Sequence, residues 1–162
     1  MKRIFLCIVI LIMVAGVGFS QNTDDWNWGG LVRFRPLATI VGLALGGLEI
    51  VVDWVPYVTP SVGIPIEIDI ASIGGIMCFG IMSGVEGVPL RHKEKSGLYL
   101  TALGGPFFIA QYVTFAVKAD IGYQLVTDGG FVLTPAIGVK YNGISGLSLD
   151  LMLDIGFAYR RK

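Results

Sequence analysis

The fold of this chain is decided by the stretch LSLDLMLDIGFAY, residues 147–159. From Leu147 to Tyr159 every second residue is large and apolar, whereas the residues between them are mostly small or polar. Successive side chains of a β-strand point to opposite faces, so this period of two predicts a strand with one apolar and one polar face. Seven apolar positions in one strand outrun the usual soluble strand and match one that crosses a membrane.

The same alternation recurs along the chain and predicts eight strands. It is clear in 48–58, 62–70, 113–125, 131–141 and 147–159, fair in 31–40, and weaker in 76–88 and 98–109. Turn-forming residues separate these segments. The turn signals are Gly46-Gly47, Thr59-Pro60-Ser61, Gly74-Gly75, the polar run Arg91 to Ser96, Gly104-Gly105-Pro106, Thr127 to Gly130, and Asn142-Gly143.

The composition is too apolar for an ordinary soluble domain. Of the 162 residues, 54% are hydrophobic and only 15% are charged, and the mean hydropathy is +0.72. Twelve basic residues balance twelve acidic ones, without the basic patch that nucleic-acid binding requires. The length predicts a single domain.

The N-terminus has the layout of a secretory signal peptide. Lys2 and Arg3 precede an apolar run from Ile4 to Val14, and small residues follow up to Ser20. We therefore expect a signal peptide at 1–20, cleaved after Ser20, a periplasmic segment at 21–30 and a barrel at 31–162.

Two other architectures compete with a membrane barrel. In a helical membrane protein, Glu67 and Asp69 would point roughly 200° apart and some charges would face lipid. In a soluble barrel or sandwich, roughly 40 bulky residues would have to fit inside, which overfills an eight-stranded lumen. The alternation therefore favours a transmembrane up-and-down antiparallel β-barrel with its apolar side chains outward.

Aromatic residues on the outward face mark two membrane interfaces. Phe131 and Tyr141 are ten residues apart, which places them about 25 Å apart in height at a tilt of about 40°. The predicted aromatic girdle comprises Trp54, Tyr123, Phe131, Tyr141, Phe157 and Tyr159.

Charged residues on the opposite face are expected to form a salt-bridge network inside the barrel, because buried charges persist only when paired. The predicted network comprises Arg33, Arg35, Glu49, Asp53, Glu67, Asp69, Glu86, Lys118, Asp120, Lys140, Asp150 and Asp154. Eight acids exceed four bases, which leaves protonated carboxyls, interior waters or a bound cation as open alternatives.

From residue 31 to 160 the chain resembles the small eight-stranded outer-membrane barrels of the OmpA transmembrane, OmpX and OmpW kind. The most specific similarity is Asp154, Gly156, Phe157 and Tyr159, which resemble the terminal-strand signal read by the barrel-assembly machinery. The chain departs from that pattern because Arg160-Arg161-Lys162 follow the final aromatic residue.

The resemblance implies a location in the outer membrane of a diderm bacterium. It also implies contact with outer-membrane lipid, and periplasmic chaperones and the assembly machinery as partners during biogenesis. We expect a monomer with both chain ends in the periplasm. The turns at 46–47, 74–75 and 142–143 then lie at the cell surface, and the polar connection 89–96 lies in the periplasm.

The most favoured function is a closed structural barrel. A narrow channel for small or apolar solutes is one alternative, as the OmpW resemblance would allow. A lipid-modifying enzyme is another, because outer-membrane lipid A deacylases use a His and Ser pair, and His92 lies near Ser96. The spacing of that pair does not match the deacylase pattern, so we expect no catalysis. We expect no metal, cofactor or nucleic-acid ligand, and interpret Cys78 as a packed side chain.

Overall fold

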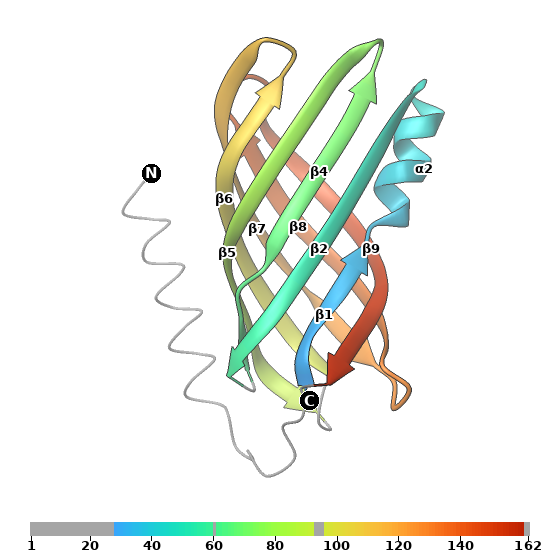
Figure 1. The fold of residues 1–162 in the computed structure, drawn as a ribbon, viewed down its shortest axis with the longest axis vertical. Coiled ribbons are helices and arrows are strands. Elements are labelled where there is room, and N and C mark those ends of the chain that lie inside the picture. The colour runs from blue at the N-terminus through green and yellow to red at the C-terminus, as the bar shows by residue number, and fades with distance from the viewer. Residues whose placement is uncertain (1–27, 60, 93–95, 161–162) are drawn as a thin grey trace.

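The computed structural model describes residues 28–59, 61–92 and 96–160. These residues form a barrel of strands with one short helix against its wall (Figure 1). In chain order the elements are β1 (Trp28–Phe34), α2 (Pro36–Ala44), β2 (Gly47–Thr59), β3 (Val62–Gly63), β4 (Ile66–Ile73), β5 (Ile76–His92), β6 (Ser96–Ile109), β7 (Tyr112–Val126), β8 (Phe131–Asn142) and β9 (Gly146–Arg160).

The sheet closes on itself through β1, which pairs antiparallel with both β2 and β9. β3 and β4 occupy one position between β2 and β5, because Gly63 and Ile66 pair with Tyr57 and Trp54 of β2 in the same register. A break at residues 64–65 separates them. The nine strands therefore fill eight positions of a closed antiparallel barrel, which confirms the predicted all-β fold and strand number.

The two ends of the barrel carry different structural elements. At the upper end of Figure 1 lie α2 and the turns β4–β5, β6–β7 and β8–β9. At the lower end lie the start of β1, the ends of β2, β5 and β9, the starts of β3 and β6, and the turn β7–β8. We use "upper" and "lower" in this sense throughout.

The predicted strand 31–40 is wrong in its second half, because Pro36–Ala44 form the helix α2. Pro36 has no N–H to donate to a strand ladder, whereas its fixed backbone angle suits the first turn of a helix. β1 accordingly ends at Phe34, and its pairing with β9 ends at Ile155. Within the described residues, no helix is long and apolar enough to cross a membrane.

The turn predicted at Gly104-Gly105-Pro106 is also wrong, because β6 runs unbroken from Ser96 to Ile109. These glycines serve close packing within the wall. A Cβ on Gly105 would collide with the backbone oxygen of Ile81, and one on Gly104 would lie 3.2 Å from the ring of Phe115. The turn falls instead at residues 110–111, where Ala110 has a φ of 51°.

Two boundaries differ from expectation at the lower end. The barrel starts at Trp28 rather than Leu31. Arg91 and His92 pair with Gly97 and Ser96, so the expected loop at 89–96 is mostly strand. The predicted signal peptide at 1–20 and most of the segment 21–30 lie outside the described residues.

The faces of the strands follow the predicted alternation. On β9, Leu147, Leu149 and Leu151 are at least 60% exposed, whereas Met152 and Asp154 are buried. On β2, Trp54 is exposed between the buried residues Asp53 and Val55. The outer surface is therefore a nearly continuous apolar coat, and the polar and charged side chains point into the lumen.

Gly156 offers a test of the seam that closes the barrel. A Cβ at this position would collide with the backbone oxygen of Val32 on β1. Overpacking of this kind costs about 1–3 kcal/mol, so Gly156→Ala should lower the free energy of unfolding by that amount in urea titrations of vesicle-bound protein. Gly129→Ala is the matched control, because the only side chain near its Cβ is Thr127, at 3.9 Å. Equal unfolding free energies for the two variants would contradict the close approach of β1 to β9.

Candidate functional site: the charged lumen

Seven strands and the residue after β1 supply the charged side chains of the lumen. Arg33 comes from β1 and Arg35 follows it; the others are Glu49 and Asp53 of β2, Glu67 and Asp69 of β4, Glu86 of β5, Lys118 and Asp120 of β7, Lys140 of β8, and Asp150 and Asp154 of β9. Each occupies the inward position of its strand, because the two-residue period keeps all of them on one face. Nine of the twelve are buried to less than a tenth of their exposed area, and Glu49, Lys140 and Asp150 are half-buried.

Arg35 is the centre of the network. Its Nε donates to Asp154 Oδ1 at 2.9 Å, and its Nη2 lies 3.3 Å from Glu67 Oε2. Its Nη1 contacts Asp150 Oδ2 at 3.4 Å, and Asp53 Oδ2 is 4.0 Å from Nη2. One guanidinium thus joins carboxylates from β2, β4 and β9 through three nitrogen atoms of a planar group with five donors.

Lys118 binds the same acids from the opposite wall. Its Nζ lies 2.6 Å from Glu67 Oε2, 3.3 Å from Asp120 Oδ2 and 3.6 Å from Asp150 Oδ2. Glu67 therefore bridges Arg35 and Lys118 across the lumen. A buried charge is tolerated only with such partners. Removal of either cation would therefore leave the shared carboxylates with less counter-charge and would destabilise the fold.

Arg33 forms the lower part of the network. Its Nη2 lies 2.6 Å from Glu86 Oε2 and 3.5 Å from Asp53 Oδ2, and its guanidinium lies 5.5 Å from the ring centroid of Tyr99. Glu86 also accepts a hydrogen bond from the hydroxyl of Tyr57 at 3.1 Å. These contacts tie β1, β2, β5 and β6 together below Arg35.

The upper part of the network is more open. Lys140 Nζ lies 2.6 Å from Asp69 Oδ2 and 4.7 Å from the ring centroid of Phe107. Among the described residues Glu49 has no ion-pair partner within 4 Å, although its backbone oxygen accepts a hydrogen bond from Thr39 at 2.6 Å. In the part of the chain that the structure describes, no cluster of His, Cys, Asp and Glu could hold a metal ion.

Apolar side chains close the lumen below the charges. Leu31, Val55, Tyr57, Val88, Tyr99 and Val132 form one buried cluster there. The hydroxyl of Tyr57 in this lower cluster accepts a hydrogen bond from Gln124 Nε2 at 3.2 Å. A second cluster lies higher, beside Lys140, and comprises Met82 of β5, Leu103 and Phe107 of β6, and Ala116 of β7. Buried side chains therefore fill the lower and middle parts of the lumen.

The predicted charge network does not include the polar residues Tyr57, Tyr99, Thr101 and Gln124. The two-residue period places Tyr57 and Gln124 on the inward face, at the same parity as the predicted charges of their strands, but the prediction named charged residues only. Tyr99 and Thr101 belong to β6, whose weak alternation concealed their inward position.

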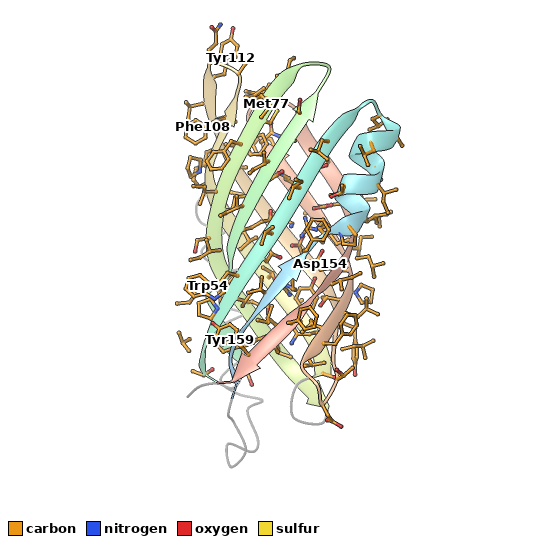
Figure 2. All side chains as sticks on the ribbon, turned by 45° about the vertical axis from the view of Figure 1, so that its right-hand side comes forward. Trp54, Met77, Phe108, Tyr112, Asp154 and Tyr159 are labelled. Atoms are coloured by element: carbon orange, nitrogen blue, oxygen red, sulfur yellow. The ribbon has the colours of Figure 1, made fainter. Side chains whose placement is uncertain are left out.

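The predicted girdle residues lie on the outer surface at two heights. Trp54 Nε1 donates to Tyr159 Oη at 3.0 Å, and Phe131 meets Phe157 edge-on with ring centroids 6.0 Å apart. Figure 2 shows Trp54 and Tyr159 near the lower end, and Phe108 and Tyr112 near the upper end. Tyr123 lies toward the lower end of β7, and Tyr141 lies near the upper end of β8. Phe79, Phe108 and Tyr112 were not predicted as girdle members.

The predicted assembly-signal residues lie on β9 where it pairs with β1. Asp154 is buried against Arg35, and Gly156 faces Arg33 across the seam. Phe157 and Tyr159 are exposed on the outer surface. The four residues thus occupy the closing strand of the barrel.

The His92 and Ser96 pair lies at the lower turn between β5 and β6, where the two residues are opposite each other in register. The Ser96 hydroxyl accepts a hydrogen bond from Val126 N at 3.0 Å. It also lies 3.4 Å from Val126 O, to which it donates. The serine oxygen therefore joins the turn to β7. The side chain of His92 lies outside the described residues.

No protein-family model and no curated protein matches the chain. Among solved structures, the solution NMR structure of de novo designed TMB2.3 is similar to it, with a TM-score of 0.43 at 12% sequence identity. The similarity covers 86% of this chain and 99% of that chain.

Proposed function

We propose that this chain is an integral outer-membrane β-barrel protein of a diderm bacterium, and that it serves as a closed structural barrel. The proposal rests on one observation: an apolar outer wall surrounds a lumen filled by paired charges and packed side chains. Water would favour the inverse arrangement, because exposed apolar area costs about 25 cal/mol per Å². Hydrocarbon around the wall removes that cost.

The outer-membrane location is supported by the chain's two ends. A basic start, an apolar run and small residues up to Ser20 fit export by a signal peptide. The strand that closes the barrel carries Asp154, Gly156 and Tyr159, in the pattern of the terminal assembly signal. We accordingly propose periplasmic chaperones and the assembly machinery as transient partners, outer-membrane lipid as the permanent one, and a monomeric state without bound nucleic acid.

A conductance measurement tests the closed barrel. Planar-bilayer recordings should show no steady porin-sized current, because Tyr57, Tyr99 and the Arg35 network fill the lumen. Far-UV circular dichroism of the same preparation in vesicles should show strand structure. This control ensures that the absence of current does not reflect failed folding or insertion. Large stepwise currents from inserted protein would contradict the closed lumen and favour the channel alternative.

We also propose that the chain is not an enzyme. The hydrogen bonds of Ser96 to the backbone of Val126 support this, because they use the hydroxyl that an activated nucleophile would need free.

A further inference from the structure

The helix α2 packs with its faces inverted relative to a helix in water. Gly42 is its buried residue, and a Cβ there would lie 2.8 Å from Glu49 N of β2. Thr39 donates to the backbone oxygen of Glu49 at 2.6 Å. Ile40 and Leu43, both 61% exposed, point away from the barrel. Small residues at the protein contact and large apolar residues outside it are typical of helices surrounded by lipid.

The helix stands where the wall lacks a strand. β1 pairs with β9 only as far as Phe34 and Ile155, so residues 146–154 of β9 are paired with β8 alone. α2 contacts both β2 and β9 across this seam, beside β2 in Figure 1. The exposed leucines of β9 and the exposed face of α2 therefore form one apolar surface.

The helix α2 and the upper turns carry no charged residues, although Glu49, Asp69 and Lys140 line the upper part of the lumen. Each upper turn lies inside an uncharged stretch, namely 36–48, 70–85, 96–117 and 141–149. Met77, Tyr112 and Ile144, which lie at these turns, are more than half exposed. Charged residues occur instead at the lower end, where β5 passes through Arg91 and β9 ends at Arg160. A rim in contact with water on the cell exterior would carry polar loops.

The height of the apolar wall also indicates that the uncharged upper turns do not project beyond the membrane. Phe157 of the lower girdle and Leu147, next to the β8–β9 turn, are ten residues apart on β9. At a tilt of about 40° this spans about 25 Å, which is the height of the apolar band of an outer-membrane barrel. The upper turns thus fall at the boundary between acyl chains and headgroups, where the exposed residues Gln111 and Ser145 can meet polar groups.

We propose that the upper end of the barrel, including α2, is immersed in membrane lipid and displays no segment above the bilayer. Acyl chains cover α2 and the adjoining leucines of β9, and the upper turns end at the headgroup boundary. This inference rests on the proposed function, because it assumes that the wall lies in a membrane. The partner of this surface is lipid, in continuity with the lipid that surrounds the rest of the wall.

Spin-label accessibility tests the proposal in phosphatidylcholine vesicles. The full chain, with Cys7→Ser and Cys78→Ser, receives one label at a time through Leu43→Cys, Met77→Cys or Ile144→Cys. Ile137→Cys, on the outer wall, is the lipid control, and Asp128→Cys, in the lower β7–β8 turn, is the water control. We expect the Leu43 and Met77 labels to collide more with oxygen than with a water-soluble nickel complex, as at Ile137, with the order reversed at Asp128. The Ile144 label should fall between them, closer to Ile137.

Each other outcome is distinct. If the upper labels resemble Asp128 while Ile137 stays in lipid, the upper end projects into water and this proposal fails, but the membrane barrel stands. If Ile137 also behaves like Asp128, the proposed function itself fails. Spin–spin broadening at Met77 that disappears on dilution with unlabelled protein would show a second copy at the upper end, and would overturn lipid as its partner.

Discussion

Arg35→Met should lower the free energy of unfolding by about 3–5 kcal/mol, the usual cost of removing one partner from a buried ion pair. Among the described residues, Asp154 has Arg35 as its only cationic partner, at 2.9 Å. Its carboxylate would then be buried without a counter-charge. Asp150 and Glu67 would keep Lys118 but lose their second contact. Urea titration of vesicle-bound protein measures the difference.

Two companion variants isolate the role of the guanidinium. Arg35→Lys retains the charge but loses the separate Nε, Nη1 and Nη2 donors that contact Asp154, Asp150 and Glu67. Its free energy of unfolding should therefore lie between those of Arg35→Met and the unaltered protein. Glu49→Gln is the matched acidic control, because Glu49 makes no ion pair among the described residues and should tolerate the change. If Arg35→Met and Glu49→Gln lower the free energy of unfolding by the same amount, Arg35 is not the centre of the network.

Leu151→Arg should cost about 2–4 kcal/mol in a bilayer, the penalty for a charged side chain on the lipid face near the midplane. Leu151 is 60% exposed on β9, and it lies between Phe157 of the lower girdle and Leu147 near the upper turn. On the surface of a soluble protein the same substitution would be nearly neutral. The free energy of unfolding in vesicles therefore separates the two environments.

The adjacent lumen position supplies the control. Met152 is 4% exposed and faces inward, so Met152→Gln should cost less than Leu151→Arg, because the lumen is already polar. A neutral Leu151→Arg would show that this face of the wall contacts water rather than lipid. A Met152→Gln more damaging than Leu151→Arg would contradict the assignment of Met152 to a polar lumen.

Local pattern predicts the strands well where one face is uniform, as on β9 and β7. It fails at Pro36, because the apolar residues that follow it suit a strand, a helix or a loop equally by periodicity. The missing N–H of Pro36 decides against the strand. It fails again at Gly104 and Gly105, where paired glycines suggest a turn, but Gly105 lets β6 approach β5 closely and Gly104 leaves space for the ring of Phe115 on β7.

On strands with clear alternation, the sequence by itself predicts which side of the wall a residue faces, because the two-residue period of a strand is a local property of the backbone. It therefore groups the charged residues on one face and the six girdle residues on the other before any fold is known, but the weak alternation of β6 leaves Tyr99 and Thr101 unassigned. Only the tertiary structure decided the partners: Glu67 with Lys118, Arg35 with Asp154, and Trp54 with Tyr159. Partner choice depends on the stagger between strands and on barrel closure, and both are set by contacts between residues far apart in the chain.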